Sequence, residues 1–152
     1  MLTYMDTDAD MFSSSASAWI NTINCKGVMG GGIALEFKKR FPLMFLDYKN
    51  KCNVNLLKPG RVYTYINDTV DKGPLIILNV ATKDDFRDPS KLEWVEDAIV
   101  SLTTTVQYYS IGSVALPALG CGLGGLNFKD VEALYRKYLT DSECNFEVYQ
   151  PR

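Results

Sequence analysis

Two glycine-rich loops are the segments of this sequence whose residue types best suit chemistry on a charged ligand. The first loop carries Gly27 and the glycines at 30–32, and the second carries Gly120, Gly122, Gly124 and Gly125. Glycine lets backbone N–H groups approach an anion closely, and the first turn of a helix adds unpaired donors at the positive end of its dipole. Each loop follows an apolar run and precedes a helical pattern, so the pair predicts a ligand with two phosphates.

A lysine follows another apolar run and is a candidate nucleophile. Lys83 lies in a polar loop beside Asp84 and Asp85, directly after the run that ends at Val80. A neutral lysine amine can attack an electrophilic carbon. A lysine next to two aspartates is ordinarily a solvated surface charge, so the residues alone leave both interpretations open.

Strands and helices alternate along the chain, and their order positions these groups. Apolar runs and alternations predict strands at residues 2–5, 18–23, 61–66, 75–80, 113–117 and 146–149. Helical patterns are predicted at residues 33–40, 43–49, 92–106 and from about 127. This order favours one three-layer α/β domain over residues 1–152, with a mixed, mostly parallel sheet. Ligands of such sheets bind beyond the carboxyl ends of the strands, where both glycine loops would lie.

Two local features refine this prediction. The strands at 61–66 and 75–80 read as a hairpin-like pair joined by a seven-residue connection at 67–73. Ser90 and Glu93 have the spacing of a capping box, which predicts that Ser90 caps the long helix that follows.

Composition excludes several classes of protein. The net charge of −2 argues against a large electrostatic footprint on nucleic acid, and no apolar run reaches membrane-spanning length. The N-terminus lacks the pattern of a signal peptide. Four scattered cysteines and no histidine argue against a metal site and for free thiols. We therefore expect a monomer in the cytoplasm, with no metal and no cofactor.

Neither glycine loop matches a common nucleotide-binding signature. Residues 120–125 read G-x-G-x-x-G, but no second strand with a ribose-binding acid follows at the distance that a dinucleotide-binding unit requires. Gly32 is followed by Ile33 and Ala34, where a Walker A loop has lysine and Ser or Thr. Two interpretations of these loops remain: their backbone N–H groups bind phosphate, or they are tight turns that serve packing alone.

Three long segments carry a resemblance to a known family. Residues 21–42 resemble the first ligand loop of macro domains, residues 116–126 resemble the second, and residues 146–150 resemble the closing segment. The branch that they resemble contains terminal ADP-ribose glycohydrolase and the macro domain of the DarG antitoxin. The resemblance implies a six-stranded mixed sheet between helices and a cleft for ADP-ribose.

The resemblance also implies roles for individual residues. Lys83 corresponds to the lysine that acts on the anomeric carbon of the distal ribose, and Asn24 to a side chain on the hydroxyls of that ribose. Asp10 would accept from the adenine amino group beside the Met11 N–H, and Tyr149 would cover the adenine face. The remaining expected contacts come from the two loops: Gly27, Val28, Met29, Gly30, Gly31, Gly32, Ile33, Leu119, Gly120, Cys121, Gly122, Leu123 and Gly124. Each polar residue also has a structural alternative: a solvated turn for Asp10, a loop cap for Asn24 and a core position for Tyr149.

The implied activity is an ADP-ribosylglycohydrolase. Terminal ADP-ribose glycohydrolase has an acid where this chain has Gly124, whereas DarG-like sequences have glycine there, so the target implied first is an ADP-ribosylated DNA base. Because glycine stands at position 124, any general acid must come from elsewhere, and Asp84 and Asp85 are the candidates. Protein acidic side chains are a further target. A phosphatase of ADP-ribose 1″-phosphate and a non-catalytic ADP-ribose reader are the alternatives. A source in a bacterium or a phage is a hypothesis about context.

Overall fold

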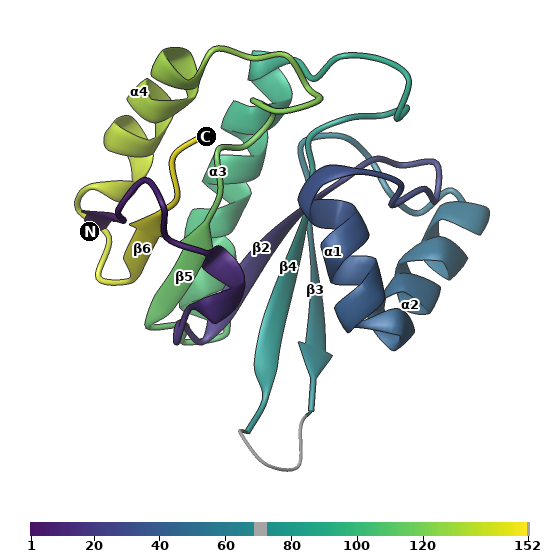
Figure 1. The fold of residues 1–152 in the computed structure, drawn as a ribbon, viewed down its shortest axis with the longest axis horizontal. Coiled ribbons are helices and arrows are strands. Elements are labelled where there is room, and N and C mark those ends of the chain that lie inside the picture. The colour runs from purple at the N-terminus through teal and green to yellow at the C-terminus, as the bar shows by residue number, and fades with distance from the viewer. Residues whose placement is uncertain (69–72, 152) are drawn as a thin grey trace.

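A six-stranded sheet with helices on both faces forms the part of the chain that the computed structural model describes, residues 1–68 and 73–151 (Figure 1). The strands are β1 (Leu2–Tyr4), β2 (Ala18–Ile23), β3 (Val62–Asn67), β4 (Leu75–Ala81), β5 (Ser113–Leu116) and β6 (Asn145–Val148). The helices are α1 (Gly32–Arg40), α2 (Pro42–Asn53), α3 (Leu92–Tyr108) and α4 (Phe128–Leu139), with a 3-10 helix, η1 (Met11–Ser13). The expected alternation of strands and helices is confirmed.

The strand order is β1-β6-β5-β2-β4-β3. Every neighbouring pair is parallel except β3 with β4, which are antiparallel, so the expected mixed and mostly parallel sheet is confirmed. The register between β2 and β5 joins Ala18 with Val114 and Trp19 with Ala115, and no further pairs follow. Beyond Trp19 the two strands separate toward their carboxyl ends (Figure 1).

The sheet divides the core into two layers because successive strand residues point to opposite faces. Ala18 and Ile20 of β2 are buried in the layer under α3 and α4, while Trp19 and Ile23 are buried in the layer under α1 and α2. The chain crosses from β2 to α1 on one face and from β5 to α4 on the other. Both connections leave the carboxyl ends of neighbouring strands, but they run to opposite faces of the sheet. Ligands of open α/β sheets bind at the point between two such strands.

The start of α3 differs from the sequence prediction. Lys91 is the N-cap of α3 and no side chain caps the helix, so the predicted capping box is wrong. Ser90 instead donates its backbone N–H to the Gly124 carbonyl at 3.0 Å, and its hydroxyl is buried without a partner. The hydrogen bond from Ser90 to the second glycine loop thus outweighs the local capping pattern.

Two other sequence predictions concern the hairpin pair and the second helix. The hairpin pair is confirmed as β3 and β4, although residues 69–72 of its connection lie outside the described residues. The helix predicted at 43–49 extends over Pro42–Asn53. Within residues 1–68 and 73–151, no helix is both long and apolar enough to cross a membrane.

Candidate functional site

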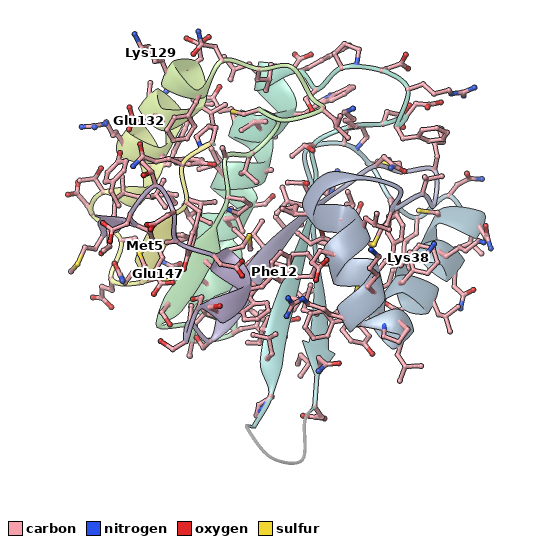
Figure 2. All side chains as sticks on the ribbon, in the orientation of Figure 1. Met5, Phe12, Lys38, Lys129, Glu132 and Glu147 are labelled. Atoms are coloured by element: carbon pink, nitrogen blue, oxygen red, sulfur yellow. The ribbon has the colours of Figure 1, made fainter. Side chains whose placement is uncertain are left out.

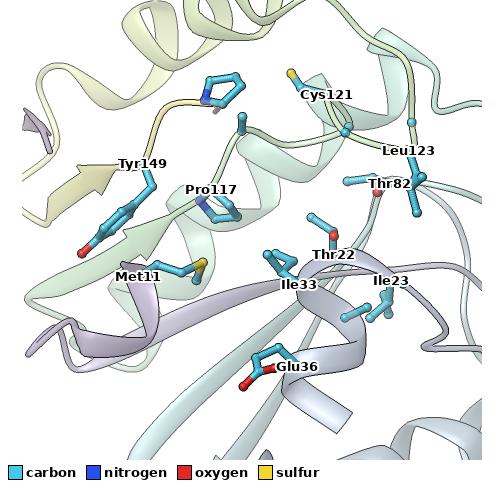
Figure 3. Close-up of a pocket in the computed structure, with 18 of the residues that line it drawn as sticks. Met11, Thr22, Ile23, Ile33, Glu36, Thr82, Pro117, Cys121, Leu123 and Tyr149 are labelled. Carbon is cyan, nitrogen blue, oxygen red and sulfur yellow. The ribbon is translucent and has the colours of Figure 1, made fainter. Parts of the chain in front are cut away.

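A cleft of about 1270 Å³ lies at the carboxyl ends of β2 and β5, between the two glycine loops (Figure 3). Its walls come from η1, the first loop with the start of α1, the segment after β4, the second loop and the residues after β6. Tyr149 and Met11 lie at one end of the cleft, and Leu123 and Thr82 lie at the other. Segments distant in the sequence therefore form one continuous surface.

Asn24 organises the first glycine loop. It follows β2, is 8% exposed, and its Oδ1 accepts from Lys26 N at 2.9 Å. Its Nδ2 donates to the Val28 carbonyl at 2.6 Å, and the Tyr48 hydroxyl of α2 lies 2.9 Å from its Oδ1. The structural role proposed for Asn24, a cap on the loop, is thus present, and one N–H of its amide group remains for a ligand.

The first loop ends in an uncapped helix. Gly31 is the N-cap of α1, and no side chain caps that helix. The first amides of a helix have no intrahelical partner, and here Gly32, Ile33 and Ala34 line the cleft. This arrangement directs backbone donors and the positive end of the helix dipole at the cleft, as an anion site requires.

The second glycine loop is held from behind. Tyr135 of α4, which is fully buried, donates to the Pro117 carbonyl at 2.6 Å and accepts from Leu119 N at 2.9 Å. Gly124 packs so closely that an added Cβ would overlap the Gly120 carbonyl and the Ser90 hydroxyl. These contacts give the loop one conformation and leave room only for glycine at position 124.

The two loops approach each other across the cleft. A Cβ placed on Gly31 would lie 3.2 Å from Cδ1 of Leu123. The Leu123 side chain is 78% exposed and extends over the cleft from the second loop. A ligand held by both loops would therefore lie beneath Leu123.

Lys83 lies on the wall that joins the loops. Its Nζ donates to the Leu123 carbonyl at 3.2 Å and to the Phe86 carbonyl at 3.4 Å. Both hydrogen bonds are long and therefore weak, so the amine can exchange them for a ligand at little cost. Further bonds hold the segment around Lys83 against β2: Cys25 N donates to Asp84 O at 2.9 Å and Thr82 N to Ile23 O at 3.1 Å.

The two aspartates after Lys83 are the candidates for the general acid. Neither Asp84 nor Asp85 lines the cleft. Arg87 donates to both carboxylate oxygens of Asp85, and this partner holds the pKa of Asp85 well below its usual range. Asp84 pairs instead with Lys26 at 3.8 Å on the surface. A general acid must carry a proton, so the Arg87 partner disfavours this role for Asp85, and Asp84 lies beside Lys26; the role of either as general acid stays a prediction.

The far end of the cleft contains the acid and aromatic groups expected around a base. The Asp10 carboxylate accepts from Phe12 N at 3.0 Å and caps η1, so its turn role is present, and Asp10 also faces the cleft. Tyr149 is 8% exposed, packs into the core and also lines the cleft, so its core position is present and its contact with adenine stays a prediction. The Arg40 guanidinium lies 4.7 Å from the centre of the Phe12 ring beside them.

Three of the expected site residues do not line the cleft. Gly27 has a positive φ of 87°, and a Cβ added to it would face Cys52 and Lys49. Met29 is 1% exposed and lies in the core. Leu119 is fully buried below the second loop. Loop residues alternate between the ligand and the core, and the sequence did not indicate which way these three point. The other expected residues line the cleft: Asp10, Met11, Asn24, Val28, Gly30, Gly31, Gly32, Ile33, Lys83, Gly120, Cys121, Gly122, Leu123, Gly124 and Tyr149.

Sequence reasoning missed part of the lining. All the missed residues except Arg40 and Ser90 lie within three positions of an expected one. They are Asp8, Ala9, Phe12, Thr22, Ile23, Ala34, Glu36, Arg40, Thr82, Phe86, Ser90, Pro117, Ala118, Gln150 and Pro151. The rule that ligands lie beyond the carboxyl ends of strands identifies the strand-end residues of this set. Nothing in the local pattern around Phe86 and Ser90 indicates that they face the same space.

Comparison with known proteins gives consistent matches. A family model described as "Macro domain" matches residues 20–135. A Mycobacterium tuberculosis protein named DNA ADP-ribosyl glycohydrolase is 40% identical over 132 residues, which are 87% of this chain and 37% of that protein. The solved macrodomain of Mycobacterium tuberculosis DarG has a TM-score of 0.90 at 35% identity, covering 100% of this chain and 99% of that chain.

A third match contains a ligand. The structure described as Thermosipho africanus DarTG in complex with ADP-ribose has a TM-score of 0.90 at 30% identity. It covers 99% of this chain and 41% of that chain. The chain described here therefore spans well under half the length of the curated Mycobacterium protein and of DarTG.

Proposed function

The chain belongs to the macro domain family, and on that basis we propose that it hydrolyses the bond between ADP-ribose and a modified DNA base. The observation that carries the proposal is the position of Lys83, whose Nζ bonds to the Leu123 carbonyl of the second glycine loop inside the cleft. The name of the Mycobacterium relative, DNA ADP-ribosyl glycohydrolase, supplies the substrate class. The reaction and its target are proposals for this chain.

The cleft fits ADP-ribose by charge and by shape. One phosphate would lie at the uncapped N-terminus of α1, and the other in the second loop beside Gly120 and Gly122. Both sites use backbone donors, so the net charge of −2 does not oppose them. Adenine would lie between Asp10 and Tyr149, and the distal ribose would lie between Asn24 and Lys83.

The proposed chemistry proceeds in two balanced steps. Neutral Lys83 attacks the anomeric carbon of the distal ribose, a C–N bond forms to Nζ, and the bond to the base breaks. The base leaves with the electron pair and takes up the proton that Nζ loses after it has bonded to carbon. Water then adds its oxygen to the same carbon and gives a proton to Nζ, the bond to Nζ breaks, and ADP-ribose is released with the lysine amine restored.

A direct test follows the mass of a modified oligonucleotide. We expect the wild-type protein to remove the ADP-ribosyl mass from a DNA strand that carries one modified base, and Lys83→Ala to leave the mass unchanged. Lys83→Ala should still bind free ADP-ribose, because backbone donors hold the phosphates. Lys129→Ala is the matched control, since Lys129 is exposed at the start of α4, outside the cleft (Figure 2).

Three outcomes separate the candidate functions. An unchanged mass with the wild-type protein overturns the DNA-directed activity. Release of phosphate from ADP-ribose 1″-phosphate by both wild type and Lys83→Ala would then indicate the phosphatase. Tight ADP-ribose binding without any turnover would indicate a reader. The monomeric state, the cytoplasmic location and the extent of the domain to residue 152 stay predictions.

A further inference from the structure

An exposed aromatic residue lines the cleft next to Lys83. Phe86 lines the cleft and is 45% exposed, and its backbone carbonyl accepts from Lys83 Nζ at 3.4 Å. The ring therefore belongs to the residue whose backbone carbonyl accepts from the Lys83 amine. This backbone contact places the residue that carries the ring beside the Lys83 amine.

A buried carboxylate fixes the cation that lies over this ring. The guanidinium carbon of Arg87 is 5.5 Å from the centre of the Phe86 ring. Arg87 donates from Nε to Asp85 Oδ1 at 3.0 Å and from Nη2 to Asp85 Oδ2 at 2.6 Å, and its backbone N–H donates to Oδ1 at 2.9 Å. The Asp85 side chain is only 12% exposed. Three hydrogen bonds to Asp85 thus hold Arg87, whose guanidinium lies over the Phe86 ring.

The charges around Phe86 do not favour a phosphate backbone. Arg87 is neutralised by Asp85, and Lys26 lies 3.8 Å from Asp84. The chain as a whole carries a net charge of −2. A surface that tracks a nucleic-acid backbone needs an excess of cations, whereas Arg87 and Lys26 each lie beside a carboxylate. An exposed ring is instead suited to the flat face of a base, since stacking needs no particular sequence.

We propose that Phe86, backed by Arg87, is the stacking platform for the single base that carries the ADP-ribose, and that the protein recognises this base rather than the DNA backbone. This inference rests on the proposed function and deepens it by naming the acceptor site. A base paired within a duplex cannot reach the ring, so the substrate is a base in a single strand or one flipped out of a duplex.

Binding measurements in a non-cleaving background test the platform. In Lys83→Ala, we expect a single-stranded oligonucleotide with one ADP-ribosylated base to bind at least tenfold more tightly than free ADP-ribose. Phe86→Ala in the same background should remove this difference and leave the Kd for free ADP-ribose unchanged. Phe86→Trp should retain the difference, and Tyr108→Ala, which removes an exposed tyrosine at the end of α3, is the matched control.

Length and salt give a second, independent readout. An ADP-ribosylated nucleoside should gain as much affinity over free ADP-ribose as a long modified strand gains. The gain should fall with salt with a log–log slope no steeper than about −0.7, the value for a single phosphate contact on a single strand. A steep slope, or a gain that grows with strand length, overturns the platform in favour of backbone binding.

The platform and the proposed function fail in different ways. If the modified strand binds no better than free ADP-ribose, or Phe86→Ala weakens both ligands equally, the platform is wrong even where hydrolysis is observed. An ADP-ribosylated peptide that shows the same gain also contradicts it, because the ring would then not select a base. Absence of hydrolysis by the wild-type protein overturns the activity alone, since the binding difference remains measurable.

Discussion

The Tyr48 hydroxyl donates to the backbone oxygen of Asn24 at 2.8 Å and lies 2.9 Å from the side-chain oxygen of the same residue. Tyr48 is 2% exposed, and burial raises the pKa of its hydroxyl, which therefore remains a donor. The second glycine loop has an equivalent support, because Tyr135 holds Pro117 and Leu119. Each loop thus faces the cleft on one side and is fixed by a buried tyrosine from the helix behind it.

Removing the first of these hydroxyls should loosen the first loop. We expect Tyr48→Phe to lower the free energy of unfolding by about 1 kcal/mol, the net value of a lost hydrogen bond. ADP-ribose affinity should fall several-fold because Asn24 no longer has a fixed orientation. Denaturant unfolding and titration calorimetry measure the two effects, with Tyr108→Phe as an exposed control. An unchanged affinity would show that the loop is fixed by other contacts.

The second hydroxyl should matter more for stability. Tyr135→Phe leaves the Pro117 carbonyl and the Leu119 N–H without a partner in a buried site, so we expect a loss of about 2 kcal/mol. Urea unfolding measures it. Tyr138→Phe on the same helix is the control, because the Tyr138 hydroxyl bonds to Glu96 at a partly exposed position where water can replace it. Equal losses in the two variants would contradict the role given to Tyr135.

Glycine is required at position 124 by space. We expect Gly124→Ala to distort the second loop, to cost about 1–3 kcal/mol as overpacking does, and to abolish ADP-ribose binding. The backbone of Gly120 is one of the two obstacles, so Ser90→Gly should not rescue the variant. Gly122→Ala is the matched control for stability, because its Cβ meets nothing within 4 Å. Equal melting temperatures for Gly124→Ala and wild type would refute the steric argument.

Cys121 should be unreactive at neutral pH although it lines the cleft. Burial raises the pKa of its thiol to about 11, so the thiolate that reacts with iodoacetamide is scarce below that pH. Alkylation should accelerate about tenfold per pH unit up to about 11, and the unfolded protein should react at the rate of an ordinary thiol of pKa about 8.5. Mass spectrometry of the peptide that contains Cys121 follows the rate.

The same shift affects stability in alkali. A thiol with a raised pKa in the folded state stabilises the protein below the pKa of the unfolded thiol, and this contribution is lost as the pH rises toward about 11. The pKa values of the Cys25 and Cys144 thiols are raised to about 12 and about 11, and they act in the same direction.

In the alkylation experiment, a reaction of native Cys121 at pH 7.5 as fast as that of the unfolded protein would contradict the burial of this thiol.

The sequence alone indicated the elements and the place of the site. Strand and helix alternation is a local signal, because apolar periodicity and glycine are read within a few residues. The position of both loops at the carboxyl ends of β2 and β5 then followed from the way parallel sheets are built. The resemblance of residues 21–42 and 116–126 to macro domain loops agrees with the family that the whole chain matches.

Only the tertiary structure decided which side of each loop faces the ligand. Met29 and Leu119 were expected at the ligand, but both side chains are buried in the core, while Phe86 was not expected and opens onto the cleft. Ser90 does not cap the helix as predicted, because the carbonyl of Gly124, which is distant in the sequence, accepts its N–H. Lys83 likewise bonds to Leu123 across 40 positions. These choices depend on packing between distant segments, and a local pattern carries no information about such contacts.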